Sequence, residues 1–240
     1  MMVTKEWPPE IYGGAGVHVA NLTTALLENG ASIDVHCFGK PRSDAQAYQN
    51  QNLELNPALA ALEIDLQITN NSIGADLVHT HTWYANFAGV LSKNFQKIPH
   101  ILTAHSLEPD RPWKEEQLGG GYRISSYLEK SGYESADAII AVSKGTKADI
   151  LRAYPFIDPD KVEVIYNGIN CNIYFPQISG ATLDKYQIDG PYALFVGRIT
   201  RQKGLIHLLR AFEDVPPEYG LVIAASSPDE PEIAAQVRAQ

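Results

Sequence analysis

The chain has 240 residues, 45% hydrophobic and 20% charged, a composition that excludes a disordered or fibrous protein and is typical of a soluble globular one. Its net charge of -9, from 19 Lys and Arg against 28 Asp and Glu, argues against nucleic acid or a membrane surface as a partner. No apolar run reaches the roughly 20 residues that a membrane span needs, and the N-terminus has no signal-peptide pattern. Cys37 and Cys171 are far apart in the sequence and have no metal-ligand spacing, which fits a reducing compartment. We therefore expect a cytoplasmic protein.

Both ends of the chain are expected to be incomplete. Met1–Val3 leads almost at once into the polar segment TKEWPP, which leaves about three residues for a first strand where about five are usual. The last residues, EIAAQVRAQ, have the pattern of a helix interior without a C-terminal stop signal.

Short apolar strands alternate with amphipathic helices along the first part of the chain. Strands are predicted at residues 32–38, 76–81, 100–105, 138–142 and 162–166. Helices are predicted at 16–28, 85–93, 125–135 and 144–154. β-branched strands separated by helices predict an α/β fold, with a parallel sheet that is covered on both faces in a Rossmann-like manner.

The composition changes after this first domain, which we assign to residues 1–167. Residues 168–190 are rich in Asn, Gly and Pro and are predicted to be a linker. A new strand, helix and strand follow in YALFVGRI, LIHLLRAF and LVIAAS, so residues 191–240 are predicted to begin a second Rossmann-like domain. About 50 residues are too few for such a domain, and we expect it to be present only in part.

Three glycines, Gly13, Gly14 and Gly16, stand directly before the first predicted helix. At the carboxyl end of a first strand, such glycines favour an anion-binding site, because the backbone N–H groups at the start of the helix can approach the anion closely. The alternative is a tight turn that binds no ligand. A dinucleotide fingerprint matches poorly, because Val19 fills its third small position and Asp34, at the distance of the ribose-binding acid, is expected inside its strand.

Histidines gather at the ends of two later strands. HTHTWYAN places His79, His81 and Trp83 at one strand end, and TAHSLEPDRPW places His105 at the next. A zinc site is disfavoured, because no carboxylate or cysteine stands at ligand spacing. We interpret His105, beside Ser106, as a contact for a substrate hydroxyl. The aromatic residues that could stack on a sugar, or belong to the core, are Trp83, Tyr84, Trp113 and Tyr122.

A basic turn follows the strand YALFV. It contains Gly197, Arg198, Arg201, Lys203 and Gly204 and precedes the helix LIHLLRAF. A glycine turn with Arg and Lys at a strand's carboxyl end favours a diphosphate site, and an ordinary solvated turn is the alternative.

Six blocks of the sequence together resemble a known family. They are EWPPEIYGGAGVHVANL, DLVHTHTWYANFAG, LTAHSLEPDRPWKEEQLGGGYRISSYLE, AIIAVSKGTKADIL, VIYNGI and FVGRITRQKGLIHLLRAF. In this order and spacing they are similar to the retaining GT-B glycosyltransferases of family GT4, and HSLEPDRPWKEEQLGGGY resembles the actinobacterial glycogen synthase branch. The resemblance covers essentially the whole chain. It implies two Rossmann-like domains across a cleft, with the acceptor mainly on the first and the nucleotide sugar mainly on the second.

The resemblance also implies where the donor binds. Gly13, Gly14 and Gly16 are expected to lie over the donor diphosphate. Arg198 and Lys203 are expected to bind that diphosphate and to stabilise the charge of the leaving group, which makes them catalytic. Since these two side chains would supply the positive charge that Mg²⁺ supplies in other enzymes, we expect neither a metal nor another cofactor.

The remaining expected site residues lie in the first domain. The resemblance implies that His105 lies beside the transferred sugar and takes part in catalysis, and we expect His81 and Trp83 to contact substrate. The implied reaction moves glucose from ADP-glucose or UDP-glucose to an α-glucan end or to glucose 1-phosphate, with retention. The sequence shows no evident pair of carboxylates of the kind that retaining hydrolases use. This agrees with a mechanism in which the leaving group departs from, and the acceptor attacks, the same face of the sugar.

One departure from the family pattern bears on activity. Family members carry a later E-x(7)-E block whose glutamates contact the donor, and the sequence ends before it. We therefore expect the 240-residue chain to be weakly active or inactive. Three alternatives stay open: a GT4 enzyme with another sugar and a lipid or small acceptor, an NAD-dependent oxidoreductase, and a noncatalytic binder of nucleotide sugars.

Overall fold

The computed structural model describes residues 1–240 apart from 53, 177–179, 201–202, 226–234, 236 and 238–240. It contains two compact units, Met1–Tyr174 and Phe175–Gln240. The division falls within the segment 168–190, which the sequence predicts to be a linker.

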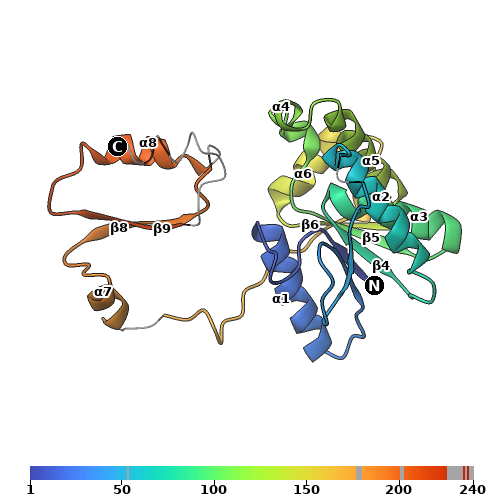
Figure 1. Ribbon diagram of the computed structural model, residues 1–240, viewed down its shortest axis with the longest axis horizontal. Coiled ribbons are helices and arrows are strands. Elements are labelled where there is room, and N and C mark those ends of the chain that lie inside the picture. The colour runs from blue at the N-terminus through green and yellow to red at the C-terminus, as the bar shows by residue number, and fades with distance from the viewer. Residues whose placement is uncertain (53, 177–179, 201–202, 226–234, 236, 238–240) are drawn as a thin grey trace. The chain divides into compact units, whose positions relative to one another are not determined.

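The first unit is built on a seven-stranded parallel sheet (Figure 1). Its strands are β1 (Met2–Thr4), β2 (Val35–Phe38), β3 (Gln46–Tyr48), β4 (Val78–His81), β5 (His100–Ala104), β6 (Ala138–Ala141) and β7 (Val162–Val164). Their spatial order is β3-β2-β1-β4-β5-β6-β7, so the chain reverses its direction of travel across the sheet between β1 and β4. In doubly wound sheets, ligands bind at the carboxyl ends of the strands beside such a reversal.

Helices cover both faces of this sheet. They are α1 (Gly14–Glu28), α2 (Pro57–Asn70), α3 (Trp83–Gln96), α4 (Lys114–Leu118), α5 (Gly121–Ser135) and α6 (Lys144–Ala153), with short 3-10 turns η1 (Glu108–Asp110) and η2 (Pro159–Lys161). Successive side chains of a strand point to opposite faces. Accordingly Met2 packs with Val19 of α1, whereas Val3 packs with Ile64 and Ile68 of α2. Helices α2, α3 and α5 lie side by side (Figure 1). The predicted α/β class is confirmed.

The edge strand β3 and helix α2 are among the elements that the sequence-based assignment missed. The edge strand β3 has only three residues, too few for a periodic pattern. Helix α2 carries clear start signals, because the Asn56 side chain accepts a hydrogen bond from the Ala58 N–H at 3.0 Å and Pro57 follows as the first helical residue. These signals were sufficient to predict the helix.

The position of Asp34 corrects one expectation. The predicted strand 32–38 begins only at Val35, and Asp34 is exposed just before it. Asp34 therefore lies at the amino end of β2, whereas the glycine-rich turn follows the carboxyl end of the neighbouring β1. A ribose-binding acid would have to lie at that carboxyl edge, so the dinucleotide interpretation fails.

The second unit begins with a strand, helix and strand, as predicted. Strands β8 (Tyr192–Gly197) and β9 (Gly220–Ala225) pair in parallel, α8 (Leu205–Phe212) connects them, and a short helix, α7 (Ala181–Lys185), precedes them. Apolar side chains of β8 are exposed, with Leu194 at 55% and Val196 at 72%. Among the residues that the structure describes, none of the helices has both the length and the apolar character to span a bilayer.

Helix α3 packs tightly on the sheet and on α5 because glycine stands at two contacts. A Cβ at Gly89 would overlap the ring of His100 in β5, and one at Gly132 would lie 2.7 Å from the Cβ of Asn86. The His100 ring cannot yield, since its Nε2 is held 2.8 Å from the Thr80 hydroxyl in the buried interior.

We predict that Gly89→Ala lowers the free energy of unfolding by about 1–3 kcal/mol, because the added methyl group overpacks the core. Thermal or urea unfolding followed by circular dichroism measures this loss. Gly145→Ala is the matched control, since Gly145 is an exposed helical residue of α6 where alanine gains about 0.5–1 kcal/mol. Equal effects of the two changes would contradict the packing argument.

Candidate active site

Three segments predicted from the sequence meet at the carboxyl edge of the first sheet. Because β1, β4 and β5 are adjacent and parallel, the residues at their carboxyl ends lie at one edge. The glycine-rich turn, residues 11–16, leads into α1 and includes its first three residues, His81 ends β4, and His105 follows β5. The structure thus brings the glycine and histidine segments together in one unit.

The histidines form a compact cluster. The Nδ1 atom of His81 lies 3.1 Å from the Nε2 atom of His105, and the ring of His18 from α1 is centred 5.1 Å from that of His105. His79 is engaged separately, with its Nε2 2.8 Å from the Thr103 hydroxyl. Sequence reasoning missed His18, although it stands two residues beyond the last glycine of the turn, in the first turns of the helix.

Burial keeps these imidazoles neutral. Burial in the first place, together with neighbouring histidines, lowers the pKa of His105 to about 3 and that of His79 to about 4. The pKa of His81 lies well below its usual range, again first through burial. The site therefore presents imidazole rather than imidazolium to a ligand at neutral pH.

The neighbours of His81 assign the tautomers. Its Nε2 lies 3.0 Å from the thioether sulfur of Met2, which accepts but has no proton to donate. The Nε2 atom of His81 must therefore carry the hydrogen, and its Nδ1 accepts from the Nε2–H of His105. This leaves Nδ1 of His105 unprotonated, able to accept a hydrogen bond from a substrate hydroxyl.

Backbone strain accompanies the cluster. Thr82, between His81 and helix α3, has φ 66° and ψ 160°, a conformation that β-branched residues rarely adopt. Strain of this kind persists where the surroundings impose it, and it concentrates at binding and catalytic sites.

The cluster also has the composition of a metal site. The ligand atoms of His18, His81 and His105 lie within 4.8 Å of one another, and neutral imidazole suits zinc and related metals. However, the lone pair of His81 Nδ1 that would bind a metal already accepts the hydrogen bond from His105. The observed geometry therefore fits a hydrogen-bonded histidine pair better, and we derive no chemical step through a metal.

Trp83 lies in the core rather than in an open site. Only 3% of its surface is exposed, and its ring stacks on that of Tyr84 with 3.8 Å between centroids. Tyr84 in turn is covered by Lys5, whose Nζ lies 3.7 Å from the ring centroid. The stacking of a sugar on Trp83, which the sequence suggested, has no accessible ring face here.

The loop after β5 is fixed from within by Glu108. Its buried carboxylate accepts hydrogen bonds from Lys114 Nζ and the Ser125 hydroxyl, each at 2.8 Å. Its N–H donates to Glu129, whose pKa burial raises to about 7. Glu108 is therefore a structural residue that holds the segment following His105, a role that the sequence did not reveal.

The predicted basic turn lies in the second unit. Arg198 follows β8 directly, and Lys203 precedes α8, where Gly204 adopts φ 68°. The Lys203 N–H donates to the Thr200 carbonyl at 3.1 Å, which closes the turn. Arg198 and Lys203 thus share one strand-to-helix turn, and Arg201 lies outside the described residues.

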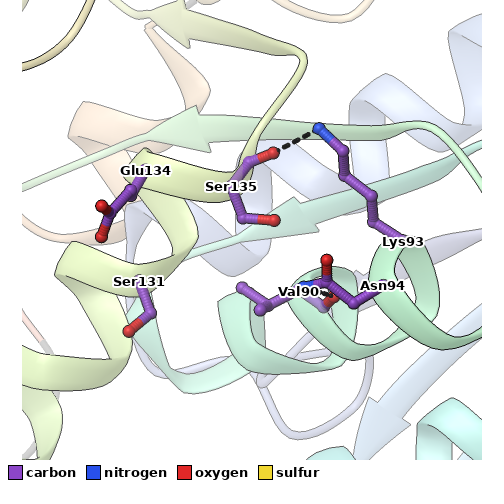
Figure 2. Close-up of a pocket in the computed structure, with 6 residues that line it drawn as sticks. All are labelled: Val90, Lys93, Asn94, Ser131, Glu134 and Ser135. Atoms are coloured by element: carbon purple, nitrogen blue, oxygen red, sulfur yellow. Dashed lines mark hydrogen bonds between the residues drawn. The ribbon is translucent and has the colours of Figure 1, made fainter.

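A separate pocket of about 370 Å³ lies between α3 and α5. Figure 2 shows its lining, which comprises Val90, Lys93, Asn94, Ser131, Glu134 and Ser135. Lys93 Nζ donates to the Ser135 carbonyl at 2.6 Å, at the helix ends that lead into β5 and β6 (Figure 2). This pocket is therefore at the amino edge of the sheet, away from the histidine cluster.

We predict that His105 and His79 do not titrate between pH 5 and pH 8, because their pKa values lie at about 3 and about 4. Nitrogen-15 NMR of the imidazoles measures this directly and also reports the tautomer of each ring. A His105 that gains a proton near pH 6.5 would contradict the buried, neutral cluster.

Comparison with known proteins agrees with this architecture. Residues 12–173, which include the glycine-rich turn and the histidine cluster, match the family described as Glycosyltransferase Family 4. The chain is 49% identical to an alpha-maltose-1-phosphate synthase of Mycolicibacterium smegmatis, over 98% of the chain and 62% of that protein. It is 47% identical to the protein of the same name from Mycobacterium tuberculosis, over 99% of the chain and 63% of that protein.

Solved structures share this fold. The crystal structure of Anabaena HepE in complex with UDP and glucose superposes with a TM-score of 0.76 at 16% identity, over 99% of the chain and 64% of HepE. The chain therefore spans less than two thirds of the length of the proteins that it matches. Because the family match covers most of the sequence, the chain belongs to Glycosyltransferase Family 4.

Proposed function

We propose that the enzyme is a retaining glucosyltransferase that moves glucose from ADP-glucose or UDP-glucose to an α-glucan end or to glucose 1-phosphate. The observation that carries this proposal is the hydrogen-bonded pair of His81 and His105 at the carboxyl edge of the sheet, which also carries a glycine-rich helix start. The relatives named alpha-maltose-1-phosphate synthase support glucose 1-phosphate as an acceptor, because maltose 1-phosphate is glucose 1-phosphate with one further glucose attached.

The chemistry assigns a task to each group. The acceptor hydroxyl attacks C1 of the glucose while the bond from C1 to the diphosphate oxygen breaks, and the hydroxyl proton passes to the leaving phosphate. His105 Nδ1 accepts a hydrogen bond from a glucose hydroxyl and adds no charge that would compete with the developing cation at C1. Arg198 and Lys203 bind the diphosphate and stabilise its negative charge as it leaves.

The proposal needs no metal ion or other cofactor, because the two cations of the basic turn serve the diphosphate. We place the reaction in the cytoplasm, which the unpaired thiols of Cys37 and Cys171 support. The 240-residue chain by itself is expected to be weakly active or inactive, since its relatives are longer by more than a third of their length.

We predict that the enzyme made from its complete reading frame adds a hexose to glycogen or to glucose 1-phosphate, detected by mass spectrometry of the products. ADP-glucose and UDP-glucose are offered in parallel, with and without EDTA. Transfer that EDTA abolishes would refute the metal-free reaction. If neither acceptor gains a hexose from either donor, the glucan assignment fails and another acceptor must be sought within the family.

Substitutions then test the basic turn. Arg198→Ala and Lys203→Ala should each lower kcat/KM for the nucleotide sugar about 100-fold or more, the order expected when a charge-stabilising group is removed. Arg210→Ala is the matched control, because Arg210 is an exposed cation at the end of α8 in the same unit. If Arg210→Ala lowered kcat/KM as much as Lys203→Ala does, the effect would come from the change in net charge and not from a contact with the diphosphate.

A further inference from the structure

The glycine-rich turn already holds a carboxylate of the protein itself. A single oxygen of Glu6, Oε2, accepts hydrogen bonds from the N–H of Tyr12 at 3.0 Å and from the N–H of Gly13 at 2.8 Å. Glu6 lies in the segment between β1 and the turn, and its side chain is half-buried. Two of the turn's amides are therefore occupied by Glu6.

The three glycines differ in what they make room for. A Cβ at Gly16 would lie 2.7 Å from the Cβ of Glu6 and 2.6 Å from its Oε2, so Gly16 accommodates the glutamate. A Cβ at Gly13 would meet the same carboxylate at an ordinary 3.8 Å. Only at Gly14 does a Cβ meet nothing within 4 Å. Gly14 is thus the one glycine of the turn whose open side faces away from protein.

Glu6 also provides the charge that helix α1 lacks at its start. The N-cap of α1 is Gly13, which offers no side-chain cap, and residues 14–17, GAGV, include no acid. A carboxylate at this position stabilises the positive end of the helix dipole and satisfies amides just outside the helix. The amides of the first helical residues, Gly14 and Ala15, have no acceptor within the helix itself.

The backbone around Glu6 is tied down on both sides. Before it, the Thr4 hydroxyl donates to the Glu6 carbonyl at 3.2 Å. After it, Nη1 of Arg42 donates to the carbonyls of Trp7 and Pro8, each at 2.9 Å. Because the Glu6 Cβ also packs against Gly16, the residue cannot leave the turn by a shift of the chain.

We propose that Glu6 is a positioning residue that holds the glycine-rich turn in the conformation that receives the diphosphate of the nucleotide sugar. It fixes Tyr12 and Gly13 through their amides and leaves the α1 start, at Gly14, open to the ligand. This inference rests on the proposed function for the identity of the ligand. The opposing interpretation is that the carboxylate is a placeholder which the diphosphate must displace.

The two interpretations predict opposite effects of removing the side chain. If Glu6 positions the turn, Glu6→Ala raises KM for the nucleotide sugar about tenfold, the order expected for the loss of a charge-assisted hydrogen bond. KM for the acceptor stays within about twofold. If Glu6 is a placeholder, Glu6→Ala lowers the donor KM instead, because a competing anion is gone. A lower or unchanged donor KM overturns the proposal.

Glu6→Gln separates geometry from charge in the complete enzyme. The glutamine Oε1 can still accept from both amides, so the donor KM should return to within about threefold of the unsubstituted enzyme. A Glu6→Gln enzyme as impaired as Glu6→Ala would mean that the two accepted hydrogen bonds contribute nothing and that only the negative charge acts, which overturns the proposal. Glu28→Gln, at the exposed last residue of α1, is the control for a neutralised acid at the other end of that helix.

A second readout is independent of the reaction. Hydrogen exchange of the Gly13 amide in the complete enzyme should accelerate about tenfold or more in Glu6→Ala and stay near its original rate in Glu6→Gln. Unchanged exchange in Glu6→Ala overturns the positioning role even if transferase activity falls. If the unsubstituted enzyme transfers no glucose while exchange follows this pattern, the proposed function fails and the hold of Glu6 on the turn stands.

Discussion

The parallel pairing of β1, β4 and β5 is the constraint on which the rest of the site depends. Parallel strands align their carboxyl ends, and the reversal of strand order between β1 and β4 opens that edge to a ligand. The turn before α1 and the two strand-end histidines come from segments up to about 90 residues apart, yet they meet because neighbouring strands share a register. The function attributed to the first unit is therefore a property of the sheet edge, not of any one segment.

Burial then determines the chemical state of that edge. His81 is completely buried, and burial lowers its pKa well below the usual range, so the ring it presents to His105 is neutral at neutral pH. A charged histidine at this position would repel the positive charge that develops on a transferred sugar. Met2, a core residue of β1, thereby assigns the tautomer of His81, because its sulfur can accept a hydrogen bond from Nε2 but has no hydrogen to donate.

The segment after β5 shows how polar groups can be buried without a catalytic role. Glu108 and Lys114 belong to the stretch that most narrowly resembles one branch of the family, and both are buried in a hydrogen-bonded ion pair. Such a pair stabilises little by itself but strongly disfavours alternatives that break it, because either partner alone would be an uncompensated buried charge. Their contribution is to fix the loop that follows His105.

The sequence alone determined the alternation of strands and helices, the glycine-rich turn, the strand-end histidines and the basic turn, because each depends on local periodicity or on residues adjacent in the chain. Tertiary structure alone decided that His18 joins His81 and His105, that Trp83 is core, and that Glu6 rather than a ligand explains Gly16. These contacts join residues whose spacing follows no single period, and whether a side chain is buried depends on what other segments pack over it. A glycine in a turn indicates that a side chain would not fit at that position, and only the packed structure shows which group occupies the space.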